Sequence, residues 1–201
     1  MKKKQFKRNA QIGCKKQPKT IILYKQRMAN IELKKVTLND IDQLQKIGRQ
    51  TFQETFSEAN SEENMKNYLE EGFSNEKLTS EVNDKNSELY FAILDDEIIG
   101  YLKLNFGESQ TEIQDNKALE IERIYVSKEC HGKSVGQILY DKAIHIAKQK
   151  NADYVWLGVW EENARAIRFY KKNGFAEFDK HIFKLGNDQQ TDIMMKLQLK
   201  G

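Results

Sequence analysis

The chain of 201 residues has one proline, Pro18, and two cysteines, Cys14 and Cys130. No proline therefore interrupts a helix or a strand anywhere after residue 18. Two cysteines in such distant segments are too few for a disulfide framework and are typical of a reducing cytosol. No apolar run approaches the ~18 residues that a membrane span requires. We therefore expect a cytoplasmic protein with no membrane partner.

Acidic residues are absent from residues 1–27, which hold ten Lys and Arg. The rest of the chain, which we call the body, has 23 basic and 30 acidic residues. The whole chain has a net charge of +3, but the body has a net charge of −7. Three interpretations of the basic segment stay open: an arm for nucleic acid or membrane, a folded extension, or sequence upstream of a start at Met28. A solvated tail is the simplest of them, and we do not expect nucleic acid as a partner. We predict an extension at residues 1–28 and one domain at residues 29–201.

Strand-like and helix-like spacings of apolar residues follow one another along residues 29–201. The predicted strands are Ile31–Val36, Leu89–Leu94, Ile98–Leu104, Leu119–Val126, Tyr154–Val159, Phe175–Lys184 and Thr191–Leu199. The predicted helices begin after the capping box Thr37–Asp40 and after Ser61, and then cover residues 75–83, Ser134–Lys150 and Asn163–Lys172. This order predicts an α/β (α+β) fold, with helices on both faces of a mixed central sheet.

A glycine-bearing loop, His131–Gly136, joins the predicted strand Leu119–Val126 to a long helix. Glycine permits positive φ and close approach of a ligand to the backbone, and the free N–H groups of a helix start favour negative charge. Lys133 adds a formal positive charge. These features indicate a site for an anion such as a pyrophosphate, although glycine at such a turn is also ordinary turn chemistry.

The strand before this loop carries two carboxylates, Glu120 and Glu122, at a spacing of two. Strict alternation would divide it into Glu120, Glu122, Ile124 and Val126 on one face and Ile121, Arg123 and Tyr125 on the other. Two carboxylates on one face could supply a base near the anion site. The alternatives are a solvated edge or a salt bridge with Arg123 or a lysine.

Asn163 and Tyr170 lie seven residues apart, about two helical turns, so they share one face of the predicted helix. Each also has an ordinary structural explanation, because Asn is a common N-cap and Tyr a common packing residue. Their place, after a strand that follows the loop helix, favours a binding group and a proton donor beside the anion site.

The segments IERIYV, HGKSVG and NARAIRFYKKNGF, in this order, resemble motifs of the GCN5-related N-acetyltransferases, the GNAT family. The resemblance covers about residues 31–199. The segments TFQETFSEANSEENMKNYLEEGF and GNDQQTDIMMK are further similar to PaiA-type bacterial spermidine/spermine N-acetyltransferases. The resemblance implies a pair of splayed central strands that form a cleft for acetyl-CoA. It also implies direct transfer of the acetyl group to a primary amine, in a ternary complex.

The resemblance assigns roles to particular residues. Backbone groups of Ile124, Tyr125 and Val126 would hold the acetyl thioester and the pantetheine arm, and Asn163 would bind the cofactor. Tyr170, near the sulfur, would be the general acid, and Glu122 would guide proton removal from the amine. The pyrophosphate cradle would comprise His131, Gly132, Lys133, Ser134, Val135, Gly136 and Gln137.

The loop departs from the family pattern at His131, where the family has Gln or Arg, and at Ser134, where it has Gly. Since serine disfavours positive φ, we expect cofactor binding that is retained but weakened. The three histidines are too scattered for a metal site, and we expect no metal.

The acidic body favours a small cationic acceptor, a polyamine such as spermidine or spermine. A protein N-terminus, a lysine or another small amine remains an alternative acceptor. A cofactor-sensing regulatory or nucleic-acid-binding protein is an alternative of another class. No feature of the sequence predicts the oligomeric state.

Overall fold

The computed structural model describes residues 30–185 and 188–200. The strands are β1 (Glu32–Lys35), β2 (Ser87–Leu94), β3 (Glu97–Phe106), β4 (Ala118–Val126), β5 (Tyr154–Trp160), β6 (Ala176–Leu185) and β7 (Asp188–Gln198). The α-helices are α2 (Ile41–Phe56), α3 (Glu62–Gly72), α4 (Asn75–Asn83), α5 (Val135–Gln149) and α6 (Ala164–Lys172). Short 3-10 turns are η1 (Leu38–Asp40), η2 (Gly107–Ser109) and η3 (Lys128–Cys130).

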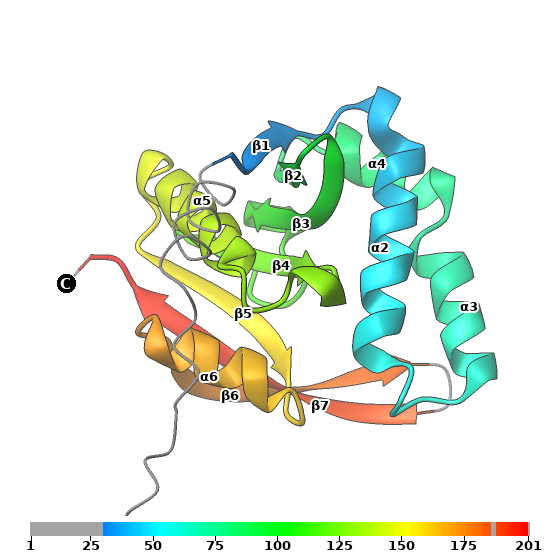
Figure 1. The fold of residues 1–201 in the computed structure, drawn as a ribbon. Helices are drawn as coiled ribbons and strands as arrows, with labels where there is room; N and C mark the ends of the chain where they lie inside the picture. The colour runs from blue at the N-terminus through cyan, green and yellow to red at the C-terminus, as the bar shows by residue number, and fades with distance from the viewer. Residues whose placement is uncertain (1–29, 186–187, 201) are drawn as a thin grey trace, which may run out of the picture.

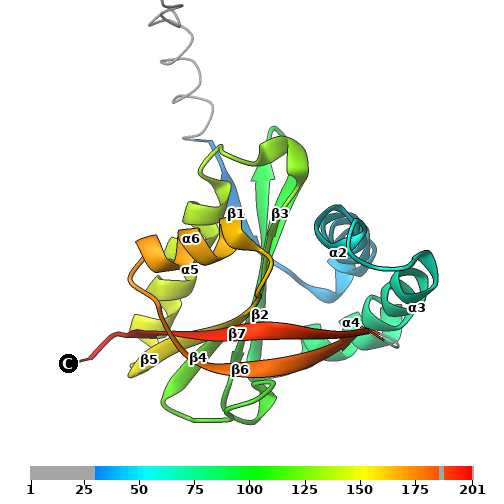
Figure 2. The same ribbon diagram turned by 90° about the horizontal axis from the view of Figure 1, so that it is seen from below.

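The strands form one mixed sheet in the order β1-β2-β3-β4-β5-β7-β6. Helices α2, α3 and α4 cover one face, and α5 and α6 cover the other (Figures 1 and 2). The larger core cluster packs β-strand side chains such as Leu102 and Leu157 against Leu139 of α5, whereas a second cluster packs Phe91 and Tyr101 against α2 and its neighbours. The predicted fold class is confirmed.

Helix starts follow the predicted capping chemistry. The Asp40 carboxylate accepts from the backbone N–H and the hydroxyl of Thr37, which opens the turn η1 before α2 begins. Ser61 accepts from the backbone N–H of Asn64 at 3.2 Å and so caps α3. The first N–H groups of a helix have no acceptor within the helix, and these side chains supply one, which stabilises the helix start.

The two central strands β4 and β5 are parallel neighbours only where they begin. Ala118–Glu120 pairs with Tyr154–Trp156, and beyond that point the strands run on to Val126 and Trp160 without pairing each other (Figure 1). Divergence of the strands opens the sheet at their carboxyl ends. The predicted splayed pair is therefore confirmed, and it positions the cavity described below.

A β-bulge corrects the predicted faces of β4. Lys103 of β3 pairs with Arg123 and Leu104 pairs with Ile121, so Glu122 is the extra residue of β4. An extra residue breaks the period of two. Ile121 and Ile124 consequently pack in the same core cluster, and the prediction that Ile124 shares a face with Glu120 is wrong.

The basic extension predicted at residues 1–28 lies outside the described residues. Among residues 30–185 and 188–200, no helix is both long and apolar enough to cross a membrane. The cytoplasmic location stays a prediction.

Candidate active site

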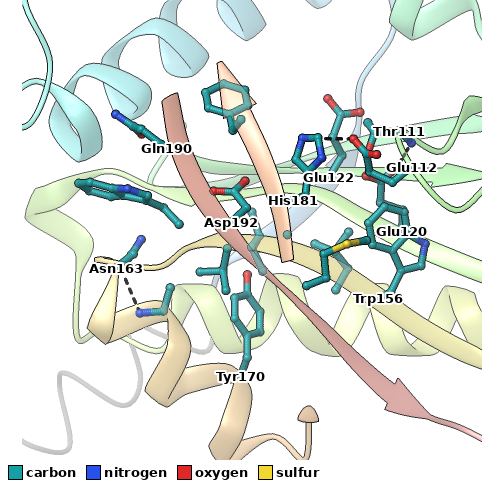
Figure 3. Close-up of a pocket in the computed structure, with 18 of the residues that line it drawn as sticks. Thr111, Glu112, Glu120, Glu122, Trp156, Asn163, Tyr170, His181, Gln190 and Asp192 are labelled. Atoms are coloured by element: carbon teal, nitrogen blue, oxygen red, sulfur yellow. Dashed lines mark hydrogen bonds and ion pairs between the residues drawn. The ribbon is translucent and has the colours of Figure 1, made fainter. Parts of the chain in front are cut away.

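A cavity of about 360 Å³ opens where β4 and β5 diverge, and β6, β7, α2, α3 and α6 complete its walls (Figure 3). Its size is that of a small-molecule site, for which about 300–1,000 Å³ is usual. Aromatic side chains form much of the lining: Phe52, Phe56, Tyr68, Tyr125, Trp156, Trp160, Tyr170 and Phe183. The cavity therefore offers a space lined largely by aromatic rings, at the point where β4 and β5 diverge.

Four carboxylates also line this cavity: Glu112, Glu120, Glu122 and Asp192. Among the lining residues that the structure describes there is no Lys or Arg, and His181 is the one that can carry a positive charge. Carboxylates together with aromatic faces attract cations, the rings through their electron-rich faces. The arrangement is thus suited to a positively charged ligand.

Six of the residues singled out in the sequence meet in this cavity: Glu120, Glu122, Ile124, Tyr125, Asn163 and Tyr170. The loop residues and Val126 lie outside the cavity lining. The walls of the cavity thus bring β4 and α6 together.

Tyr170 points into the cavity from α6, with its ring packed against Phe169 and Phe175 (Figure 3). Its hydroxyl has no hydrogen-bond partner among the described residues. Burial raises its pKa above the ordinary range, so the hydroxyl keeps its proton at neutral pH. A protonated, unengaged hydroxyl inside the cavity is able to donate a proton to a leaving group.

Asn163 has the structural role that its residue type suggested, and it also lines the cavity. Its side-chain oxygen accepts from the backbone N–H of Ala166 at 3.1 Å and caps α6. The side-chain NH2 makes no hydrogen bond to a described residue and stays available as a donor. The cap fixes the direction of that donor.

The loop from His131 to Gln137 leads into the N-terminus of α5. Gly132 has φ +74° and Ser134 has φ +61°, both in the left-handed region. A Cβ at Gly132 or Gly136 would meet no atom within 4 Å, so the backbone there is open to a ligand. The buried Val135 side chain holds the start of α5 in the core. The segment fits a pyrophosphate, which the first N–H groups of α5 would bind.

Two loop side chains are engaged within the protein. His131 Nε2 lies 2.8 Å from the carbonyl oxygen of Val126 and 3.1 Å from Arg165 Nη2. A proton on Nε2 lets it donate to Val126, and the Arg165 contact is then no hydrogen bond. Burial lowers the pKa of His131, and the nearby Arg165 guanidinium lowers it further. Gln137 donates to Asn173 Oδ1 at 3.1 Å. His131 is therefore a neutral group at pH 7, and backbone amides together with Lys133 remain for an anion.

Replacing Ser134 with Gly is expected to stabilise the protein. Left-handed backbone costs a non-glycine residue about 1–2 kcal/mol, partly offset by the greater unfolded-state freedom of glycine, so we expect a gain of about 1 kcal/mol. Since Ser134 already has this conformation, its strain is a cost of folding. The expectation that Ser134 weakens cofactor binding stays a prediction, which the affinity of Ser134→Gly for acetyl-CoA tests. Urea denaturation and acetyl-CoA titration measure both. The opposite kind of change at the other left-handed position, Gly132→Ala, should lower the free energy of unfolding. A Ser134→Gly variant that is less stable than the wild type would contradict this explanation.

Glu122 belongs to a largely buried charge cluster with Glu81, Lys103 and Arg123. Its carboxylate lies 2.6 Å from Lys103 Nζ and 3.0 Å from Arg123 Nη2, and it accepts from Asn105 at 2.6 Å. Although burial by itself raises the pKa of Glu122, Arg123 and Lys103 outweigh it and lower the pKa to about 2. Such a carboxylate is a weak proton acceptor, and the geometry favours the salt bridge with Arg123 or a lysine.

Sequence reasoning missed Asp192, Glu112 and Gln190 and set His181 aside. These residues lie on β6, β7 and the loop before β4, and only the pairing of the strands brings them to the cavity (Figure 3). One signal was present in the sequence. Asp192 occupies the same strand face as the buried Met194, where an apolar residue is usual.

The family model for the acetyltransferase (GNAT) family matches residues 42–175. The chain belongs to the GNAT family. It is accordingly an acetyl-CoA-dependent N-acetyltransferase, and the cavity at the splayed strands, beside the loop that fits a pyrophosphate, is its candidate active site.

Relatives of this GNAT acetyltransferase have similar lengths. An uncharacterised N-acetyltransferase of Lactobacillus delbrueckii subsp. lactis is 37% identical over 172 residues, which are 86% of this chain and 99% of the relative. A spermidine N(1)-acetyltransferase of Thermoplasma acidophilum is 31% identical over 154 residues, 75% of this chain and 91% of the relative.

A solved structure resembles the GNAT acetyltransferase along most of its length. The PaiA N-acetyltransferase of Thermoplasma acidophilum, in complex with coenzyme A, has a TM-score of 0.71 and is 26% identical. The match covers 84% of this chain and 99% of that one. In the described part of this chain, no group of three or more His, Cys, Asp or Glu is placed to hold a metal ion.

Proposed function

We propose that this GNAT acetyltransferase acetylates a primary amine of a small cationic molecule, a polyamine such as spermidine or spermine. The observation that carries the proposal is the cavity, in which four carboxylates and eight aromatic rings surround a space without Lys or Arg among its described lining residues. A polyamine presents several ammonium groups on an apolar chain, and that combination matches carboxylates set among rings.

The body of the protein supports the same acceptor class. Outside residues 1–27 the chain has a net charge of −7, which attracts a cation toward the cavity over longer distances. A relative named as a spermidine N(1)-acetyltransferase, at 31% identity, adds support from a different direction. The alternative of a nucleic-acid-binding sensor depends on the basic segment, which lies outside the described residues, and no structural observation favours it.

The chain's own residues would divide the work as follows. Acetyl-CoA supplies a reactive acetyl thioester. The amides that begin α5, with Lys133, bind its pyrophosphate, while backbone groups of Ile124–Val126 on the open edge of β4 and the Asn163 side chain orient its arm. The cavity holds the amine beside the thioester, which supplies acceleration through proximity. Tyr170 gives its proton to the sulfur.

A panel of acceptors tests the proposal. The assay compares spermidine and spermine with a monoamine of equal chain length, free amino acids and short peptides. We expect the polyamines to have a kcat/KM about 10–100-fold above that of the monoamine, because one hydrogen bond to a charged group contributes about 1.5–3 kcal/mol. The advantage should shrink as salt screens the charges. A monoamine or a peptide acetylated as well as spermidine would contradict a polyamine acceptor.

A further inference from the structure

We infer that Asp192 is the residue that takes the proton from the attacking amine. This inference rests on the proposed function and deepens it by naming the proton acceptor. Asp192 lines the same cavity as Tyr170, and the two side chains enter it from β7 and α6 (Figure 3). Tyr170 would then give a proton to the leaving sulfur, and Asp192 would take a proton from the attacking amine.

The hydrogen bonds of the four cavity carboxylates single out Asp192. Glu122 is held by two cations and an amide. Glu120 accepts from Asn105 and from both the backbone N–H and the hydroxyl of Thr111. Glu112 is paired with His181 at 3.3 Å. Asp192 makes no hydrogen bond or ion pair with a described residue, so both of its oxygens are free to accept.

The neighbouring strand leaves room beside this carboxylate. Asp192 lies across from Trp160 on β5 and from His181 on β6. At Gly158, the next cavity-facing position of β5, a Cβ would lie 3.5 Å from Asp192 Oδ2. Because Gly158 has no side chain, that flank of the carboxylate stays uncovered and open to an amine.

The charged and titratable groups around Asp192 come from several elements. His181 on β6 favours its ionised form, whereas Glu161 after β5 opposes it. Tyr68 on α3 and Tyr170 on α6 face the same cavity as neutral hydroxyls. Burial is the largest influence and raises the pKa of Asp192 to about 6. Asp192 is thus ionised at pH 7 yet a stronger base than Glu122.

The protons and electrons of the step balance. The ammonium gives one proton to an Asp192 oxygen, and the freed lone pair of nitrogen forms the C–N bond. Tyr170 gives its proton to the sulfur, which leaves with the electron pair of the C–S bond. The second proton lost by the nitrogen restores the Tyr170 hydroxyl through water, and Asp192 releases its proton to solvent.

The test compares Asp192→Asn and Glu112→Gln in the full chain, from pH 5 to pH 9, with spermidine and saturating acetyl-CoA. Wild-type kcat/KM should fall below about pH 6, where Asp192 becomes protonated. Asp192→Asn should lose kcat by about 10²-fold at pH 7, as loss of a general base does. Its kcat should recover as the pH rises toward the pKa of the substrate amine, because an amine that is already deprotonated needs no base. The matched control Glu112→Gln removes one charge from the same cavity, so we expect a higher KM for spermidine. The acid limb of its pH profile, the fall in kcat/KM below about pH 6, should be kept.

Two further measurements separate proton transfer from structure. Asp192→Glu, which restores a carboxylate, should regain the acid limb and part of the rate. Carboxyl NMR of the wild-type protein bound to coenzyme A should show a group titrating near pH 6 that is missing in Asp192→Asn. An Asp192→Asn variant that keeps wild-type kcat and its acid limb would overturn the role of Asp192 and leave the proposed function standing. A wild-type protein that binds acetyl-CoA but acetylates no amine would overturn both.

Discussion

Tyr170→Phe is expected to lower kcat by about 10²-fold, the usual effect of removing a general acid, while the KM for acetyl-CoA changes little. The substitution removes the one hydroxyl oxygen and keeps the ring that packs against Phe169 and Phe175. Since that hydroxyl bonds no described residue, its loss should not disturb α6. Steady-state kinetics with spermidine, at several concentrations of each substrate, give both constants.

The matched control is Tyr140→Phe. Tyr140 packs in the same core cluster, but its hydroxyl lies 3.4 Å from the carbonyl oxygen of Asn173 and outside the cavity lining. We expect this variant to keep the wild-type kcat. If Tyr170→Phe also keeps it, Tyr170 is not the proton donor. If both variants lose activity equally, the loss reports damage to the shared core.

Glu122→Gln is expected to destabilise the fold by about 3–5 kcal/mol, the usual cost of removing one partner from a buried ion pair. The variant would leave Lys103 and Arg123 facing Glu81 alone, at 2.9 Å and 2.8 Å. Two largely buried cations would then share one carboxylate, and the cluster joins α4 to β3 and β4. Urea denaturation at pH 7 measures the difference in the free energy of unfolding.

The pH dependence of this difference provides a second check. The folded protein lowers the pKa of Glu122 from an ordinary 4.5 to about 2. Its contribution is therefore complete above about pH 4.5 and is lost as the pH falls toward 2. The stability difference between wild type and Glu122→Gln should shrink over that range. As a control, Glu177→Gln breaks an exposed pair with Lys171 and should cost no more than about 1 kcal/mol. Equal losses for the two variants would contradict a structural role for the cluster.

The strands and helices could be predicted closely because their signals are local. Apolar spacing marked each element, and the side chains of Asp40 and Ser61 accept backbone N–H groups at the starts that their residue types suggested. The bulge at Glu122 could not be predicted in this way, because it depends on how β3 pairs with β4. One extra residue there puts Glu122 and Arg123 into one ion cluster with Lys103, which strict alternation along the strand does not predict.

The candidate site likewise combines residues that local spacing predicts with residues that only strand pairing places there. Its Asn163 and Tyr170 were predictable, since both lie on one helix at a fixed spacing. Asp192 and His181 were not, because they reach the cavity only through the pairing of β5, β6 and β7 at the far edge of the sheet. Contacts between distant segments leave no local pattern in the sequence, and Asp192 and His181 reach the cavity through such contacts.

The proposed function requires that the acetyl group of acetyl-CoA pass directly to an amine of a cationic acceptor in the cavity at the splayed strands. Acetyl-CoA labelled with carbon-13 in the acetyl group, mixed with the full chain and spermidine, tests it most directly by mass spectrometry of all products. We expect labelled N-acetylspermidine, one free coenzyme A thiol for each amide formed, and no label on the protein. Label that stays on coenzyme A, or that accumulates on the protein, would contradict it.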